Sequence, residues 1–355
     1  MNMSLIKDYS NSHESQLATL LDEVNIDSDC SYTISGESIF VSKQTPYQNY
    51  NKDFSNFGDN QCADKQMLKE QLLQHLTQTL YSQYYCGISK EFAHNKLPAK
   101  KQRDAFMNEI SQFNASTNEL DKNWKVYAVD GQGNAFAEKN GNLRQVLPNS
   151  YAKNSQQLQD VLTVNQTVDF YRQRENKENQ AVFYYVFGNE YMTNDCQMMR
   201  VYWNVSAKGA GQLIKEITIK LNEYKVPFQF KCLNHPELYF RNDSAVLYFD
   251  KTQLTIVSML IKPIIKSIKP YLVDKIPLFT DKLATGVALA EDPGQGQSFG
   301  MSRAILIAEA LLVAYEENLS NKNNRNKRVK KYLIDKGVNL QNMALNPHTT
   351  KLILH

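Results

Sequence analysis

In the second half of the chain, short runs of β-branched and aromatic residues alternate with segments of helical periodicity. Such runs between turn residues predict strands, whereas apolar residues spaced three or four apart predict helices. The predicted elements are strands over residues 182–187, 198–205, 228–233 and 245–249, and helices over residues 210–224, 254–268 and 303–315. Because strands and helices come in groups, we expect an α+β fold, with helices packed on a mixed, mainly antiparallel sheet.

The first half of the chain has a helical pattern in two places. Leucines recur every four residues within residues 65–84, which is typical of an amphipathic helix, and a second helix is expected over residues 100–113. Farther along, residues 124–129 and 135–139 alternate apolar and polar side chains around the turn Asp130-Gly-Gln-Gly-Asn134. This pattern predicts a β-hairpin.

The start of the chain is rich in Ser, Asn, Asp and Tyr, and only residues 14–24 suggest a short helix there. We therefore expect little fixed structure in this part. The predicted division of the chain is a loosely ordered extension (1–60), a helical region (61–120), an α+β domain (121–320) and a basic C-terminal tail (321–355).

Basic and acidic residues nearly balance, and the net charge of +3 does not predict nucleic acid as a partner. Near the C-terminus, however, six cations follow one another with no acid between them. Such a run is usually a solvated helix face or loop and sometimes a nucleic-acid or membrane surface, and the sequence leaves these alternatives open. The six cations are Lys322, Arg325, Lys327, Arg328, Lys330 and Lys331.

The five cysteines are scattered, odd in number and without a C-x-x-C pair. This argues against a disulfide framework and a structural zinc site, and the six histidines also lack the spacing of metal ligands. The sequence contains neither a secretory leader nor an apolar stretch of about 18 residues. We therefore expect a cytoplasmic protein without a membrane span and without a metal.

Period-two alternation places several polar side chains on one face of the predicted sheet. On the strand over residues 198–205, Arg200 and Tyr202 point away from the apolar residues, and Lys231 does the same on the strand over residues 228–233. If both apolar faces cover the same helices, these three residues share a surface. The alternative for Lys231 is a snorkelling lysine on a solvated sheet face.

A further arginine precedes the strand over residues 245–249. Arg241 comes two residues before Asp243 and three before Ser244. These side chains are candidates for the same surface, although an ion pair between Arg241 and Asp243 within a turn is the simpler interpretation.

Arg303 opens the last predicted helix. A cation there opposes the helix dipole, whereas the free backbone N–H groups of a helix start favour an anion. Arg303 is therefore expected either to help bind a negative ligand or to pair with a carboxylate such as Glu291 or Asp292.

Arg200, Arg241 and Arg303 would together form a cationic pocket around Lys231. Positive charges crowded around a lysine lower its pKa, which prepares the amine to act as a base. Motifs for other chemistries are missing: the sequence has no dinucleotide-binding glycine motif after a strand, no P-loop and no G-x-S-x-G elbow.

Five ordered motifs in this half of the chain resemble the HopA-type effector family, which is named for a plant-pathogen type III secreted protein. The likeness covers residues 124–312, and no match is recognisable before about residue 60 or after about residue 320. The motifs are Arg200-Val-Tyr-Trp-Asn204, Val226-Pro-Phe-Gln-Phe-Lys231, Arg241-Asn-Asp-Ser-Ala-Val-Leu-Tyr248, Leu289-Ala-Glu-Asp-Pro293 and Ser298-Phe-Gly-Met-Ser-Arg303.

The resemblance implies a chemistry. Family members in class V lanthipeptide and thioamitide pathways eliminate phosphate from Ser or Thr residues that a partner kinase has phosphorylated, and the logic parallels that of phosphothreonine lyases. By resemblance, Lys231 would be the base and Tyr202 the proton donor, and three arginines would bind phosphate. No metal or cofactor is needed. The arginines are Arg200, Arg241 and Arg303, with Asp243 and Ser244 as further pocket candidates.

Two functions are therefore expected from the sequence. The first is a phosphoserine/phosphothreonine lyase that acts on a phosphorylated peptide or protein. The alternative is a non-catalytic effector or adaptor that acts through protein contacts and is secreted into a host cell by a type III system. The Ser- and Asn-rich start fits a secretion signal, although such composition more often marks plain disorder.

Overall fold

The structure is a computed structural model. It describes residues 12–41, 65–88, 99–146, 151–152, 162–178, 180–192, 196–294 and 296–349.

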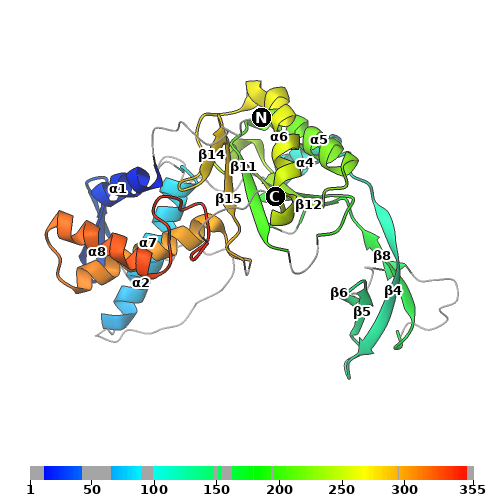
Figure 1. The fold of residues 1–355 in the computed structure, drawn as a ribbon, viewed down its shortest axis with the longest axis horizontal. Coiled ribbons are helices and arrows are strands. Elements are labelled where there is room, and N and C mark those ends of the chain that lie inside the picture. Colours follow the sequence, from blue (N-terminus) through cyan, green and yellow to red (C-terminus); the bar gives the residue numbers. More distant parts are fainter. Residues whose placement is uncertain are drawn as a thin grey trace.

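A seven-stranded sheet forms the centre of the described structure (Figure 1). All of its strand pairs are antiparallel, whereas the sequence predicted a mixed, mainly antiparallel sheet. In spatial order the strands are β14 (Asp281–Ala284), β15 (Val287–Glu291), β11 (Met198–Trp203), β13 (Ala245–Asp250), β12 (Phe228–Leu233), β10 (Phe183–Phe187) and β9 (Glu175–Asn176).

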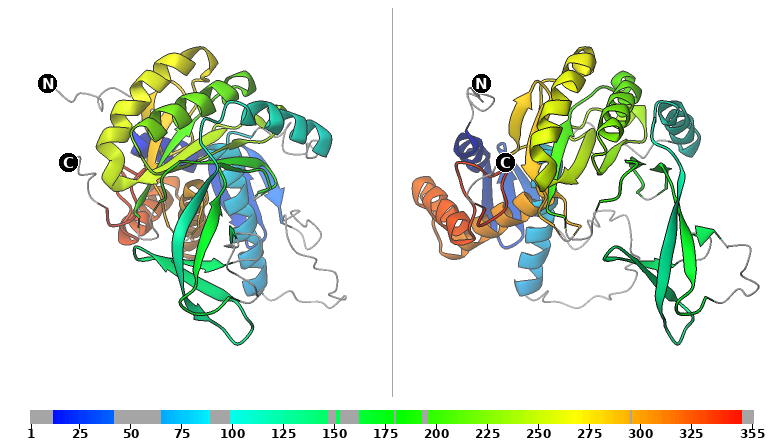
Figure 2. Two further views of the ribbon diagram at one scale, coloured as in Figure 1. Left: turned by 90° about the vertical axis from the view of Figure 1, so that its right-hand side faces the viewer. Right: turned by 45° about the vertical axis from the view of Figure 1, so that its right-hand side comes forward.

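One face of this sheet packs against three helices, α4 (Lys100–Ser111), α5 (Ala207–Glu223) and α6 (Leu254–Ile268). Alternate residues such as Val201 and Trp203 point into this layer and are fully buried, since each strand presents every second side chain to the same face. In Figures 1 and 2, α5 and α6 lie side by side over the sheet and turn their outer surfaces away from the body.

The opposite face of the sheet packs against a second helical layer. Tyr202, Val246 and Tyr248 from the sheet share a buried cluster with residues of this layer. The layer consists of α1 (His13–Glu23), α2 (Lys65–Thr79), the π-helical turn η1 (Leu80–Tyr85), α7 (Phe299–Glu316), α8 (Lys322–Asp335) and a small sheet of β1 (Val24–Ser28), β2 (Ser31–Ile34) and β3 (Glu37–Phe40).

A separate five-stranded antiparallel sheet projects from this body (Figures 1 and 2). It has its own small core, in which Trp124 packs edge-on against Phe170. Its strands are β4 (Glu119–Val129), β5 (Ala135–Lys139), β6 (Asn142–Val146), β7 (Tyr151–Ala152) and β8 (Thr167–Arg172), and short 3-10 turns elsewhere are η2 (Pro236–Leu238), η3 (Lys251–Gln253) and η4 (Lys269–Tyr271).

The fold class is confirmed as α+β, and the predicted strands, the hairpin β4–β5 and the helices of the second half all form. Two expectations differ from the structure: the loose order expected at the start of the chain and the basic tail expected at its end. Residues 12–41 are not loosely ordered, because Leu17, Leu21 and Tyr32 are buried against the second helical layer. The short helix expected there is α1. The boundaries between the four predicted parts stay a prediction.

The C-terminal basic run is an ordered helix rather than a tail. In α8, Lys322 pairs with Asp22, Arg328 with Glu317 and Lys330 with Glu14. Arg325 donates to the backbone carbonyl of Leu21 and to Asn25. Most of this charge therefore attaches α8 to α1 and to the end of α7. Among the described helices, none combines the length and apolarity that a membrane span requires.

Candidate functional site

The strand register brings the predicted base to the α7 side of the central sheet. Lys231 on β12 lies opposite Tyr185 on β10 and opposite Val246 on β13, and Val246 in turn lies opposite Tyr202 on β11. Arg200 is two residues from Tyr202 and therefore points to the same side. The sequence prediction that Arg200, Tyr202 and Lys231 share a face is confirmed.

Three cations in this region alternate with aromatic rings. The Lys231 ammonium lies 4.3 Å from the ring centre of Phe183 and 5.6 Å from that of Tyr248. The Arg241 guanidinium stands over the same Phe183 ring at 5.6 Å, and the Arg200 guanidinium over the same Tyr248 ring at 5.1 Å. Shared rings thus place Lys231 between two arginines, each contact favourable through the ring quadrupole.

Both arginines are already held by carboxylates. Arg200 donates to Asp292 at 2.5 Å and to the backbone carbonyl of Gln297 at 2.8 Å. Arg241 binds Asp243 through two hydrogen bonds of 2.8 Å. The simpler interpretation of Arg241, an ion pair in a turn, is therefore confirmed. The cluster is less positive than the sequence suggested, because each guanidinium has a neutralising partner.

Lys231 differs from its two neighbours because it has no carboxylate within ion-pair distance among the residues that the structure describes. Burial lowers the pKa of Lys231; Tyr185 and Asp243 oppose this change, while Arg200 and Arg241 reinforce it. A buried amine surrounded by fixed cations loses its proton more readily. A lysine of this kind is the group in the cluster best suited to act as a base.

Tyr202 lies on the same face but is sealed beneath the second helical layer. It is 1% exposed, and its ring packs against those of Tyr85 and Phe299. Burial raises the pKa of Tyr202 to about 12. Two other tyrosines lie nearer to Lys231. Tyr185 is its direct cross-strand partner, with the ring centre 6.0 Å from the ammonium, and the ring centre of Tyr248 lies at 5.6 Å.

The structure does not bring Arg303 into this cluster. The helix α7 begins at Phe299 and is capped by Ser298, so Arg303 lies beyond the first turn and its free N–H groups. Its guanidinium donates to the backbone carbonyls of Met343 at 2.9 Å and Leu345 at 2.6 Å, and it stacks on Phe299. Neither sequence alternative describes this arrangement: the partners are carbonyls of the C-terminal segment.

The carboxylates expected to pair with Arg303 have other partners. Glu291 accepts a hydrogen bond from Lys251 at 2.6 Å, and Asp292 holds Arg200. Burial lowers the pKa of Arg303 to about 10, which leaves it charged at neutral pH.

Ser244 joins two strands rather than lining a pocket. Its fully buried hydroxyl accepts the N–H of Val205 and lies within hydrogen-bond distance of the carbonyls of Trp203 and Val205. Ser244 therefore fixes the end of β11 against the start of β13.

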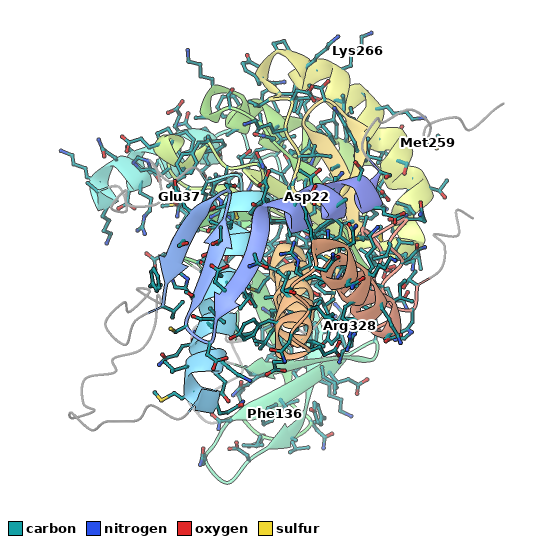
Figure 3. All side chains as sticks on the ribbon, turned by 90° about the vertical axis from the view of Figure 1, so that its left-hand side faces the viewer. Asp22, Glu37, Phe136, Met259, Lys266 and Arg328 are labelled. Atoms are coloured by element: carbon teal, nitrogen blue, oxygen red, sulfur yellow. The ribbon has the colours of Figure 1, made fainter. Side chains whose placement is uncertain are left out.

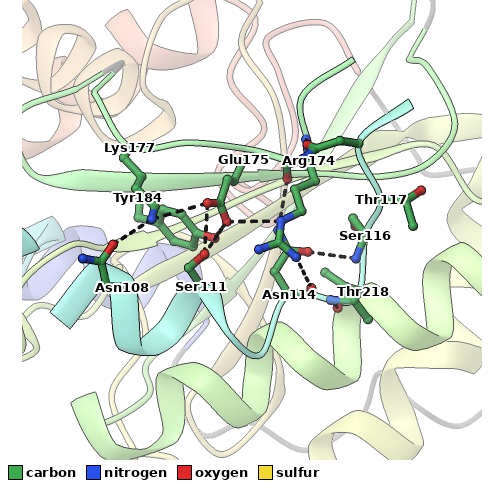
Figure 4. Close-up of polar contacts among 12 residues, drawn as sticks. Asn108, Ser111, Asn114, Ser116, Thr117, Arg174, Glu175, Lys177, Tyr184 and Thr218 are labelled. Carbon is green, nitrogen blue, oxygen red and sulfur yellow. Dashed lines mark hydrogen bonds and ion pairs between the residues drawn. The ribbon is translucent and has the colours of Figure 1, made fainter. Parts of the chain in front are cut away.

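A hollow of about 980 Å³ lies away from Lys231, where β8 and β9 meet. Glu175 at this hollow accepts hydrogen bonds from Tyr184 at 2.6 Å and Ser111 at 2.7 Å (Figure 4). Burial alone would raise the pKa of Glu175, but these bonds and nearby Lys177 and Arg174 lower it overall. The charged groups neutralise one another, which indicates a structural joint between α4 and the sheet.

Comparison with known proteins finds a family that part of this chain resembles. Residues 174–345 match the model of the HopA1 effector protein family. Over these residues the chain is similar to the HopA1 effector protein family. The match contains all five motifs and includes α8 and the segment that Arg303 binds, so the expectation that the likeness ends near residue 320 was wrong.

Two solved structures are similar to this chain. One is the effector protein from Pseudomonas syringae pv. tomato strain DC3000, with 17% identity, 78% of this chain and 95% of that chain covered, and a TM-score of 0.44. The other is the effector protein from Pseudomonas syringae pv. syringae strain 61, with 15% identity, coverages of 77% and 95%, and a TM-score of 0.43. No curated protein matches the sequence.

Sequence reasoning missed three residues of the cluster around Lys231. Tyr185 had only a weak signal, because β10 reads Phe-Tyr-Tyr-Val-Phe and period two puts one tyrosine on each face of the strand. Tyr248 is the last residue of the Arg241–Tyr248 motif, but no role was assigned to it. Asp292 had no usable signal as the partner of Arg200, because that pairing depends on β15 aligning with β11.

Proposed function

We propose that this chain binds phosphorylated peptides and eliminates phosphate from phosphoserine or phosphothreonine. The observation that carries the proposal is Lys231, a partly buried amine of lowered pKa without a carboxylate partner among the described residues, set between two arginines. An unpaired lysine in such surroundings is disfavoured as a cation and available as a general base.

In the proposed reaction, Lys231 removes the α-proton of the phosphorylated residue. The electron pair of that C–H bond forms a double bond between Cα and Cβ, the Cβ–O bond breaks, and phosphate leaves with the bonding electrons. The products are a dehydroamino acid, inorganic phosphate and a protonated lysine, which returns its proton to solvent. Every step balances without a redox partner.

Arg200 and Arg241 are the proposed phosphate contacts. Their carboxylate partners fix both guanidinium planes, and within the described residues neither Nη1 group has a hydrogen-bond partner. Donors that are oriented before the substrate arrives stabilise developing charge at little reorganisation cost. The two Asp–Arg pairs therefore support phosphate binding rather than preclude it, provided that the Nη1 groups make the contacts.

The proposed proton donor is Tyr185 in place of Tyr202. It gives its proton to the departing oxygen and regains one from the protonated Lys231 opposite it, so the net products are unchanged. Tyr185 faces Lys231 directly across the ladder, whereas Tyr202 is separated from it by β13 and is covered by Phe299. Arg303 has no part in this proposal, since its donors bind backbone carbonyls.

The test uses the full chain with phosphoserine and phosphothreonine peptides of varied flanking sequence, and mass spectrometry of the products. Elimination gives a peptide that has lost phosphoric acid, whereas hydrolysis would restore the hydroxyl. Lys231→Ala should abolish elimination, and Lys262→Ala, an exposed lysine on α6, is the matched control. Full activity of Lys231→Ala at unchanged stability would exclude this lysine as the base.

The second candidate is a type III secreted effector that acts through protein contacts, which the family description favours. Fusion of the chain to a translocation reporter in a strain with a type III system tests it: type III-dependent signal inside host cells supports secretion. A cytoplasmic enzyme with a partner kinase would give no reporter signal inside host cells.

A further inference from the structure

Five lysines crowd the outer surface of the layer formed by α5 and α6. All five are exposed, and none has a carboxylate within 4.0 Å in the part of the chain that the structure describes. They are Lys208 and Lys215 on α5, and Lys262, Lys266 and Lys269 on α6 and the turn that follows it.

The two helices bring these lysines together. Ser267 on α6 donates to Glu216 on α5 at 2.8 Å, and the N–H of Ser206 binds the carbonyl of Tyr271, so the start of α5 lies beside the end of α6. Glu216, the one acid between the two helices here, is also engaged by Lys220 at 3.8 Å. The surface therefore carries an uncompensated positive charge.

Apolar side chains stand among these lysines. Met259 is 64% exposed, and Ile219 is 43% exposed. Figure 3 shows that Met259 and Lys266 both point away from the body of the protein. On α6, Met259, Lys262 and Lys266 follow one another at spacings of three and four residues, which places them on a single helical stripe.

The basic helix α8 shows that such a surface is not a general property of this chain. Its sequence is more basic than that of α6, but Lys322, Arg328 and Lys330 are tied to acidic residues of α1 and α7. The lysines of α6 therefore lack carboxylate partners among the described residues, although the sequence of α8 is the more basic of the two.

We propose that the outer face of α5 and α6 docks on an anionic lipid surface. Lysines beside exposed apolar side chains match a membrane interface, where the ammonium groups meet lipid phosphates and the apolar groups enter the headgroup boundary. Nucleic acid is a poorer match, because this stripe has neither arginines nor a series of stacking aromatic rings.

The test is co-sedimentation of the full chain with vesicles of phosphatidylcholine alone and of phosphatidylcholine with phosphatidylserine. Binding should require phosphatidylserine and weaken as salt is added. The double variant Lys262→Gln/Lys266→Gln should bind about 30-fold more weakly, from roughly 1 kcal/mol per lysine near an anionic surface. Met259→Ser should weaken binding further without changing its salt dependence.

The matched control is Lys327→Gln/Lys331→Gln on α8, which removes the same charge at the same spacing from exposed positions. It should bind as the parent does. Equal weakening by both double variants, or no binding to phosphatidylserine vesicles, overturns the proposal. Stronger binding to polyglutamate or duplex DNA than to vesicles assigns the surface to that partner instead. None of these lysines belongs to the Lys231 cluster, so phosphopeptide turnover should stay unchanged in every variant.

Discussion

Arg303 provides the sharpest separation between a structural and a ligand-binding role. Its guanidinium is 2% exposed and donates to the carbonyls of Met343 and Leu345. Arg303→Met keeps much of the side chain's volume but removes both donors. A buried carbonyl left without a partner costs about 1–3 kcal/mol, so the loss is about 2–6 kcal/mol for two.

Part of this cost is offset, because the substitution also removes a buried charge whose pKa burial lowers to about 10. We therefore expect Arg303→Met to reduce the free energy of unfolding by about 3 kcal/mol. Arg303→Lys keeps the charge but cannot donate to both carbonyls in the geometry of a guanidinium. Its free energy of unfolding should lie between those of Arg303→Met and the parent.

Urea unfolding of the three proteins measures this difference, and amide hydrogen exchange localises it. Exchange at residues 343–346 should accelerate most in Arg303→Met, because that segment loses its attachment to α7. If the free energy of unfolding of Arg303→Met stays within about 0.5 kcal/mol of the parent, Arg303 does not stabilise the C-terminal segment, since surface substitutions typically stay within that margin. Loss of phosphopeptide binding at unchanged stability would restore the sequence prediction that Arg303 binds phosphate.

Three further predictions concern His13, Ser244 and Lys231. The N–H of Met343 donates to Nδ1 of His13, and burial lowers the pKa of His13. The unfolded chain therefore takes up this proton first, and stability should fall as the pH drops below about 6.5. His13→Asn should lose that part of the pH dependence in urea titrations. Ser244→Ala leaves the buried N–H of Val205 unpaired and should cost about 2 kcal/mol in thermal unfolding while sparing phosphopeptide turnover. For Lys231, whose pKa burial lowers, the elimination rate should rise with pH and level off below the usual lysine value of about 10.4, and stopped assays across pH should show this plateau.

Much of the central sheet could be predicted from the sequence because its strands and helices have strong local patterns. The period-two argument placed Arg200, Tyr202 and Lys231 on one face, and the register agrees. Local alternation determines which side of a strand a residue occupies, so it is sufficient for this purpose.

The partners of the arginines could not be predicted in the same way. Asp292 reaches Arg200 only because β15 pairs with β11 across about 90 residues of sequence, and Arg303 finds carbonyls 40 residues farther along the chain. The small sheet β1–β3 was missed for a related reason. Its strands are only four or five residues long, and they become stable through packing against α2 and α7 rather than through their own pattern.

The most direct test of the proposed chemistry follows the α-hydrogen. A phosphoserine peptide with deuterium at Cα is incubated with the full chain, and the product and its rate are compared with those of the unlabelled peptide. Removal of this hydrogen by Lys231 predicts a dehydroalanine peptide without deuterium, formed more slowly from the labelled substrate, and no product from Lys231→Ala. A serine peptide that keeps its deuterium, or an unreacted phosphopeptide at every pH, would contradict the account.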